Sequence, residues 1–328
     1  MMGWISLRRK LLGSAFLGNR LRLCYGRLLR ARGDGKIYFR AKFHLLLIPL
    51  AKFVRRHQLI GGYLTANGEY FLMTPDRLLL YYNFSNPELT RGDGQSLEFL
   101  SAYQDSRLEK FILETAATGS VYIDVGANSG YYYALKVARA SPQAAVFAFE
   151  PDPRILYHLK KNVEINQLSN VTIVPLALVD APGIATMTED LGASNFVVPT
   201  AAPSVDQPVT SVSCDTLDNF IASRRLSGVS LIKADIEGGE HAFLLGGREQ
   251  IQRQRPILLL ELDDALLTRS GSSVAAVLSL LAEWQYCCFR VKGSRDALAF
   301  PRDKIDRLPM DRDDWLTEVA AISEGKAD

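Results

Sequence analysis

The segment Asp124–Gly130 joins a predicted strand to a predicted helix and reads Asp-Val-Gly-Ala-Asn-Ser-Gly. In an open parallel sheet, ligands bind beyond the carboxyl ends of the strands, where glycines let the backbone approach them closely. The next predicted strand, Ala145–Phe149, is followed at once by Glu150, whose carboxylate is placed to accept hydrogen bonds from a ribose diol. Glycines also serve such a turn for geometry alone, but the loop and the acid together predict a site for a nucleoside-containing cofactor.

The spacing of the glycines distinguishes between the candidate cofactors. A dinucleotide fingerprint is G-x-G-x-x-G, whereas here the pattern from Gly126 to Gly130 is G-x-x-x-G, with Asp124 before it. An acid at the end of the strand would repel a pyrophosphate, but it suits the ammonium group of S-adenosylmethionine. The segment also lacks the Gly-Lys-Ser/Thr sequence of a P-loop. These residues favour S-adenosylmethionine, and an NAD-dependent oxidoreductase is the weaker alternative.

A second charged group ends the apolar strand predicted over Ser230–Ala234. Lys233, Asp235 and Glu237 occupy alternating positions, so their side chains start on the same side of the chain. Charged groups at this place are costly unless they are paired or functional. Lys233 therefore either braces the sheet through an ion pair with Asp235 or Glu237, or the segment carries the catalytic groups. In the second case Asp235 orients or deprotonates an acceptor hydroxyl. The candidate catalytic residues are Asp235, Glu237, Lys233, Glu261 and His241.

The same residues could also, in principle, bind a metal ion or take part in hydrolysis. Asp235, Glu237 and Glu261 are oxygen donors of the kind that Mg²⁺ prefers, and Mg²⁺ stays an untested option. His241 is the nitrogen donor nearby, and no HxxxH or ExxH spacing occurs, so no metal ligand is assigned. No G-x-S-x-G elbow places a nucleophile for serine hydrolase chemistry.

Alternating apolar strands and helices must position these residues. Strands this apolar are typical of a parallel sheet that is covered by helices on both faces. The pattern predicts a doubly wound α/β domain over residues 116–301 with a mostly parallel sheet. The predicted strands are 121–125, 145–149, 171–174, 230–234, 257–261, 286–291 and 297–300, and the predicted helices are 131–140, 153–166 and 274–284.

Smaller elements are expected around this domain. Residues 61–115 hold a β-hairpin, with Asn67-Gly68 as its turn, and a lead-in helix over Ser96–Thr118. The insertion Leu178–Leu217 is expected to help form the acceptor pocket together with the hairpin. Residues 302–328 are predicted to be a solvated C-terminal tail with one docked turn at Trp315-Leu316.

Charge is segregated along the chain. Residues 1–57 carry 14 Lys and Arg against one acid, a net charge of +13, which leaves −11 for the remaining residues. Residues 1–60 are predicted to be a basic amphipathic helical arm that lies on an anionic membrane surface, or that packs on its own domain or on a partner. No recognition motif accompanies the charge, so nucleic acid is not an expected partner.

The compartment follows from the cysteines and from the apolar runs. Four scattered cysteines cannot build a disulfide framework, which favours a reducing, cytoplasmic compartment. The apolar run Phe43–Ala51 is about half of the roughly 20 residues that a spanning helix needs. No transmembrane helix is predicted, and the protein is expected in the cytoplasm or peripherally on the inner face of the membrane.

Five segments of the sequence form a recognisable set of motifs: Ile123–Tyr132, Phe149–Asp152, Thr216–Asp218, Lys233–Glu240 and Pro256–Glu261. With these motifs the chain resembles the FkbM family of S-adenosylmethionine-dependent methyltransferases. The resemblance is colinear across about residues 98–300 and does not cover residues 1–60. Ala234, usually aliphatic in the family, and Gly239, usually alanine, depart from the family pattern without removing a chemical group.

This resemblance implies a class I methyltransferase fold, with a seven-stranded sheet whose last strand is antiparallel. It also implies methylation of a hydroxyl on a glycan, glycolipid or lipid-linked metabolite. Glu150 would hold the ribose hydroxyls of S-adenosylmethionine. The residues implied for its methionine part are Asp124, Gly126, Asn128 and Gly130. A catalytically silent, membrane-associated binding protein on the same fold is the alternative from another functional class.

Overall fold

A computed structural model describes residues 61–64, 70–74, 76–81, 106–118, 121–189, 195–198 and 208–319. The chain divides into two compact units, Met1–Ala102 and Tyr103–Asp328. The basic arm predicted over residues 1–60 lies outside the described residues, as do the Asn67-Gly68 turn and residues 96–105 of the lead-in helix.

The first unit contains a small antiparallel sheet of three strands. Strand β1 (Gly61–Leu64) pairs with β2 (Tyr70–Met73), which confirms the pairing of the predicted hairpin, and β2 pairs with β3 (Leu79–Tyr81). The sequence pattern did not predict β3. The buried Thr74 hydroxyl closes the turn before it, because the hydroxyl accepts a hydrogen bond from the Leu78 amide at 3.0 Å.

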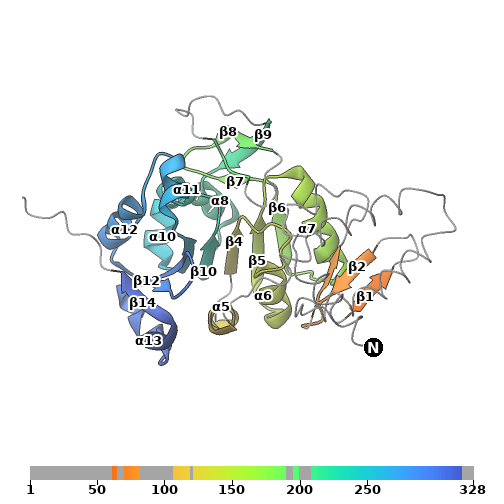
Figure 1. Cartoon of the computed structure of the whole chain (residues 1–328), viewed down its shortest axis with the longest axis horizontal. Coiled ribbons are helices and arrows are strands. Elements are labelled where there is room, and N and C mark those ends of the chain that lie inside the picture. Colours follow the sequence, from red (N-terminus) through yellow and green to blue (C-terminus); the bar gives the residue numbers. More distant parts are fainter. Residues whose placement is uncertain are drawn as a thin grey trace, which may run out of the picture. The chain divides into compact units, whose positions relative to one another are not determined.

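The second unit is built on one sheet of eight strands (Figure 1). Its order is β14-β12-β13-β11-β10-β4-β5-β6, and the strands from β11 to β6 are mutually parallel. Strand β13 runs antiparallel to both of its neighbours, β11 and β12. The mostly parallel doubly wound sheet is therefore confirmed. The strands are β4 (Val121–Val125), β5 (Ala145–Phe149), β6 (Val171–Val174), β10 (Val229–Ala234), β11 (Ile257–Glu261), β12 (Tyr286–Val291), β13 (Asp296–Pro301) and β14 (Leu316–Val319).

The eighth strand differs from the seven-stranded expectation. Residues 302–319 form a 3-10 helix (Arg302–Arg307), the short helix α13 (Arg312–Trp315) and β14, where the sequence predicted a solvated tail with one docked turn at Trp315-Leu316. Strand β14 pairs antiparallel with the open edge of β12. Trp315 is buried beside Phe111, with 6.4 Å between the ring centroids, and this contact holds the segment on the sheet. Residues 320–328 lie outside the described residues.

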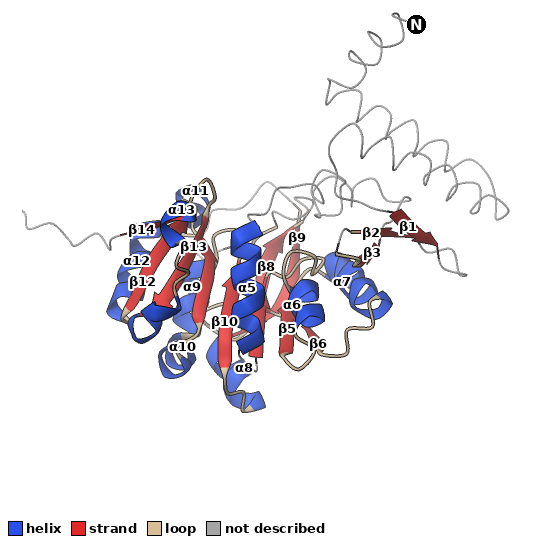
Figure 2. Cartoon of the chain, turned by 90° about the horizontal axis from the view of Figure 1, so that it is seen from below, coloured by secondary structure: helices blue, strands red, loops and turns tan. Residues whose placement is uncertain are grey.

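Helices cover both faces of the sheet (Figure 2). Helix α5 (Ser106–Thr118) packs against α6 (Ala134–Ala140) on one face. On the other face, alternate residues of β4 join one apolar core with residues of five further helices. Those helices are α8 (Leu217–Arg224), α9 (Glu240–Gly246), α10 (Arg248–Gln254), α11 (Asp264–Arg269) and α12 (Val274–Glu283). Among the described residues, no helix has the length and apolarity needed to cross a membrane.

The insertion between the third and fourth parallel strands forms its own small sheet. Strand β9 (Val209–Asp215) lies between β7 (Ala177–Leu178) and β8 (Gly183–Thr188). The small core of this sheet consists of Ala177, Met187 and Val212. The sequence pattern predicted a loop region here, because most side chains of β8 and β9 are exposed or half-buried and give no long apolar run.

Candidate functional site

The loop after β4 needs both of its predicted glycines, for two different reasons. Gly126 has φ +71°, and a Cβ there would lie 2.1 Å from the Asp235 carbonyl oxygen, so a side chain would separate two loops of the site. Gly130 has φ +81°, and a Cβ there would lie 2.0 Å from Leu135 Cδ1. Gly130 therefore allows helix α6 to pack on the loop. Helix α6 begins at Ala134 rather than at Tyr131, because a turn follows Gly130.

Lys233 and Asp124 form a buried ion pair beneath this loop. Lys233 Nζ lies 3.2 Å from Asp124 Oδ1, and it donates hydrogen bonds to the carbonyls of Gly126 at 2.8 Å and Val125 at 3.3 Å. The other Asp124 oxygen accepts a hydrogen bond from the Ala134 amide at 3.1 Å. Burial raises the pKa of Asp124, although the charge of Lys233 opposes this shift. Both residues are therefore occupied in fixing the loop.

The charge of Lys233 is maintained by its acidic neighbours. Burial lowers the pKa of Lys233, but the carboxylates of Asp124 and Asp235 outweigh burial, so the net shift is upward. From the sequence, Asp235 and Glu237 were the expected partners. The structure places Asp124 nearest, and Asp235 Oδ2 follows at 3.7 Å.

Glu150 lies at the tip of β5 with both carboxylate oxygens directed at backbone amides. Oε2 accepts a hydrogen bond from the Asn128 amide at 3.0 Å, and Oε1 accepts one from the Asp152 amide at 2.9 Å. Asp152 caps helix α7 (Pro153–Ile165) by accepting a hydrogen bond from the Arg154 amide. Burial raises the pKa of Glu150 to about 7. The capped helix thus fixes this acid next to the loop after β4.

A pocket opens at the carboxyl ends of the parallel strands, between the predicted loop and the insertion. Gly126, Asn128 and Glu150 line it, whereas Asp124 and Gly130 support the loop from behind. Asp235 and Glu237, from the loop after β10, add two further carboxylates to its lining. The apolar part of the lining includes Ile155, Leu176, Leu178, Met187, Phe196 and Val197. An apolar wall beside a buried carboxylate at the end of a parallel strand suits a nucleoside.

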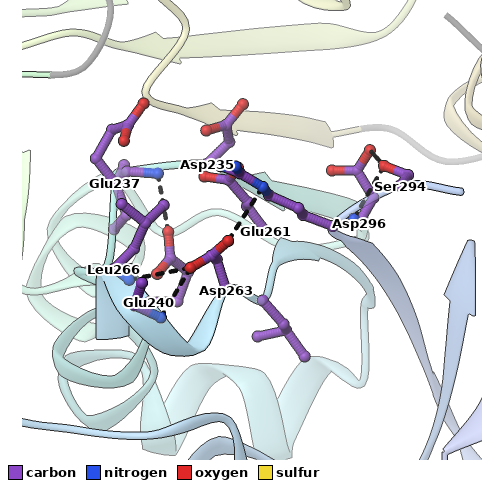
Figure 3. Close-up of polar contacts among 12 residues, drawn as sticks. Asp235, Glu237, Glu240, Glu261, Asp263, Leu266, Ser294 and Asp296 are labelled. Carbon is purple, nitrogen blue, oxygen red and sulfur yellow. Dashed lines mark hydrogen bonds and ion pairs between the residues drawn. The ribbon is translucent and has the colours of Figure 1, made fainter. Parts of the chain in front are cut away.

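Three of the predicted catalytic residues meet beside this pocket (Figure 3). Asp235, Glu237 and Glu261 each bring one carboxylate oxygen within 4.8 Å of the other two. Burial raises the pKa of Glu261 to about 8, and the charges of Asp235 and Glu237 add to this shift. Such a group of acids can share a proton or hold a divalent cation.

His241, the remaining predicted catalytic residue, lies apart from this cluster. It is half-buried on α9 and does not line the pocket. Burial lowers the pKa of His241, and the charged group that opposes this shift is Asp180, in the insertion. The structure therefore does not bring His241 together with the three acids.

Several residues of the site were not singled out from the sequence. Glu240 is fully buried, and its Oε1 accepts a hydrogen bond from the Ile236 amide at 2.9 Å, which holds the loop between Asp235 and Glu237. Asp296, on strand β13, is paired in register with Glu261 on the adjacent strand β11. For Glu240, its position in the motif that starts at Lys233 was a sequence signal that could have identified it. No such signal was available for Asp296, because its contact with Glu261 depends on the order of the strands in the sheet.

Curated relatives are similar in sequence to part of this chain. The 2-O-methyltransferase NoeI of Sinorhizobium fredii is 25% identical over 179 residues, which cover 50% of this chain and 72% of NoeI. The hexuronic acid methyltransferase AglP of Haloferax volcanii is 29% identical over 166 residues, 48% of this chain and 64% of AglP. This chain thus spans less than two thirds of AglP. The crystal structure of methyltransferase FkbM from Methylobacillus flagellatus aligns with a TM-score of 0.39 and 19% identity, over 56% of this chain and 43% of that one.

A family model described as the methyltransferase FkbM domain matches residues 124–289. The match begins at Asp124, near the end of β4, and it includes Glu150, Lys233, Asp235 and Glu261. It covers half of the chain and contains the whole pocket lining described above. The chain therefore belongs to the FkbM methyltransferase family.

Proposed function

We propose that the protein transfers a methyl group from S-adenosylmethionine to a hydroxyl group of a glycan, glycolipid or lipid-linked acceptor. The observation that carries the proposal is Glu150, a buried acid that lines the pocket between the glycine loop and an apolar wall. Two relatives support the acceptor class, since one is named a 2-O-methyltransferase and the other a hexuronic acid methyltransferase.

The residues present fit such a cofactor. Each Glu150 oxygen accepts one backbone hydrogen bond, and a carboxylate oxygen has a second lone pair for a ribose hydroxyl. Gly126 and Asn128 would contact the methionine part through the backbone, while Asp124 fixes their loop. The apolar wall that includes Leu176 and Met187 would take the adenine ring.

The acid cluster would serve the acceptor. When bound, S-adenosylmethionine supplies a methyl group on a sulfonium, which is a good leaving group. Asp235 lines the pocket with its side chain 44% exposed, so it is placed to orient the acceptor hydroxyl. As the acceptor oxygen gains the methyl group and S-adenosylhomocysteine leaves, the single hydroxyl proton would pass to one carboxylate of the cluster, Asp235 or Glu261. Positioning supplies much of the rate, and the acids contribute by accepting that proton.

Calorimetry with S-adenosylmethionine, S-adenosylhomocysteine and NAD tests the cofactor. We expect binding of the first two, and Glu150→Ala should weaken it at least tenfold. Glu164→Ala, at an exposed acid near the far end of the same helix α7, is the matched control and should bind as the wild type does. Binding of NAD alone would overturn the proposal. Labelled S-adenosylmethionine with fractionated lipids and glycans would then identify the acceptor fraction.

A further inference from the structure

Residues 195–197 of the insertion, which are Asn195, Phe196 and Val197, line the pocket. Their backbone is tied to β8, because the Phe196 amide donates a hydrogen bond to Thr188 Oγ1 and the Thr188 amide donates one to the Phe196 carbonyl, both at 3.0 Å. Phe196 is only 6% exposed. A large buried ring on a short segment therefore forms part of the pocket wall.

Arg269 holds this ring from outside the pocket. It is the last residue of α11 (Asp264–Arg269), and its guanidinium carbon lies 3.6 Å from the centroid of the Phe196 ring. The same guanidinium donates a hydrogen bond from Nη2 to the Glu237 carbonyl at 2.7 Å. Glu237 also lines the pocket, and its φ of +56° is strained for a residue with a side chain. One arginine thus connects two separate parts of the pocket lining.

The elements that carry these groups are themselves fixed. Asp263 caps α11 by accepting hydrogen bonds from the amides of Ala265 and Leu266, so Arg269 is held at a set distance from the end of β11. At the opposite side, Asn195 Nδ2 donates a hydrogen bond to Asp152 Oδ2 at 2.9 Å. Residues 195–196 therefore connect the start of α7 to α11, beside the strand ends where Gly126 and Asp235 line the same pocket.

We propose that Arg269 is a positioning residue that sets the affinity for the cofactor by holding the Phe196 ring and the Glu237 turn in the pocket wall. This inference rests on the proposed function, because it takes the pocket to be the site of S-adenosylmethionine. A planar guanidinium stacks on an aromatic face and donates a directed hydrogen bond at the same time. A lysine keeps the charge but not the stacking.

The test measures the Kd of S-adenosylhomocysteine by calorimetry on the full chain. We expect Arg269→Ala to raise Kd about fivefold to tenfold, and Arg269→Lys to raise it by less. In steady-state assays the KM for S-adenosylmethionine should rise by the same factor, while kcat stays within about twofold. A residue that only stabilised the fold would not produce this split between KM and kcat.

A matched control exists on another helix. Arg224, in α8, stacks on Phe220 with 4.6 Å between the guanidinium carbon and the ring centroid, and Phe220 belongs to the core and does not line the pocket. Arg224→Ala removes a similar contact and should leave Kd unchanged. In a double-mutant cycle, Arg269→Ala should cost less affinity in a Phe196→Leu background than in the wild type.

The outcomes separate this inference from the proposed function. If the wild type does not bind S-adenosylhomocysteine, the proposed function fails. If the wild type binds S-adenosylhomocysteine and both Arg269→Ala and Arg269→Lys bind it with the wild-type Kd, the role of Arg269 is overturned while the proposed function stands. The role of Arg269 would also be overturned if Arg269→Ala raised Kd by the same factor in the Phe196→Leu background as in the wild type. Should Arg269→Ala fail to fold, Arg269→Lys and the cycle built with it decide the question.

Discussion

Lys233 and Asp124 face each other across the paired strands β10 and β4, with 3.2 Å between Nζ and Oδ1. Both side chains are at least 94% buried, and the Lys233 ammonium also binds two carbonyls of the loop that follows β4. Two residues more than a hundred positions apart thus fix the loop that forms the floor of the pocket. The catalytic assignment that the sequence suggested for Lys233 becomes a supporting one.

Lys233→Met is expected to destabilise the fold. It leaves the Asp124 carboxylate buried without its cation, and breaking a buried pair in this way costs about 3–5 kcal/mol. The free energy of unfolding in urea measures the effect. Adding Asp124→Asn should recover part of the loss, because it removes the unpaired charge. A double variant that loses the sum of both single effects would contradict the pairing.

The sequence predicted the parts of the site that depend on local pattern. The Asp124–Gly130 loop and Glu150 each lie at the end of an apolar strand, so their place at the sheet edge follows from the order of the elements. The contact between Lys233 and Asp124 was missed, because it depends on β10 lying beside β4 in register. No periodicity within either strand encodes that register.

The insertion shows a second limit of the sequence. Met187, Asn195 and Phe196 of the insertion line the pocket, but the chemistry of Met187 and Phe196 alone did not mark them as pocket residues. Phe196 acquires its role from Arg269, a contact between the insertion and α11. Likewise β14 carries two apolar residues around Thr317 and Glu318, too few to predict a strand.

Glu261→Gln is expected to make the stability less dependent on pH. The pKa of Glu261 is about 8 in the fold, because of burial and neighbouring acids, against an ordinary value of 4.5. The folded state therefore binds the proton more tightly, and this contribution to stability is complete below pH about 4.5 and is lost as pH rises through 8. Thermal unfolding from pH 5 to pH 9 should show a shallower decline for Glu261→Gln than for the wild type. Glu164→Gln, a control on α7 away from the acid cluster, should show the wild-type slope.

Gly126→Ala should abolish cofactor binding as well as destabilise the protein. The added Cβ would meet the Asp235 carbonyl at 2.1 Å, in addition to the cost of φ +71°. Gly271 provides the control, since it has φ +78° and a Cβ added there would have nothing within 4 Å. Gly271→Ala isolates the backbone cost of about 1–2 kcal/mol. Calorimetric binding should survive in Gly271→Ala and disappear in Gly126→Ala; equal binding by the two variants would show that the loop tolerates the contact.

The basic arm, outside the described residues, is open to a direct test on the full chain. If residues 1–57 dock the protein on anionic membranes, changing Arg20, Arg22, Arg27 and Arg30 to Gln should reduce sedimentation with acidic liposomes, since each basic residue near such a surface contributes about 1 kcal/mol. The quadruple variant and the wild type should bind S-adenosylhomocysteine with the same Kd. Unchanged sedimentation would contradict a membrane role for the arm.

Asp235→Asn should slow methyl transfer without weakening the cofactor. The amide cannot accept a proton from the acceptor hydroxyl, and the loss of a general base typically costs about 10²–10⁴-fold in rate. Asp235 is 3.7 Å from Lys233, whose ammonium keeps its closer contact with Asp124, so the loop should retain its structure. We therefore expect a fall in kcat of about 10²-fold, with the Kd of S-adenosylhomocysteine within about twofold of the wild type.

Glu261→Gln should lower kcat by a smaller factor than Asp235→Asn, because Asp235 lines the pocket and Glu261 does not. The two acids lie within one cluster, so the comparison of their variants decides which of them takes the proton first. If instead Glu261→Gln abolishes transfer while Asp235→Asn retains it, the proton passes to Glu261 first, and Asp235 only orients the acceptor.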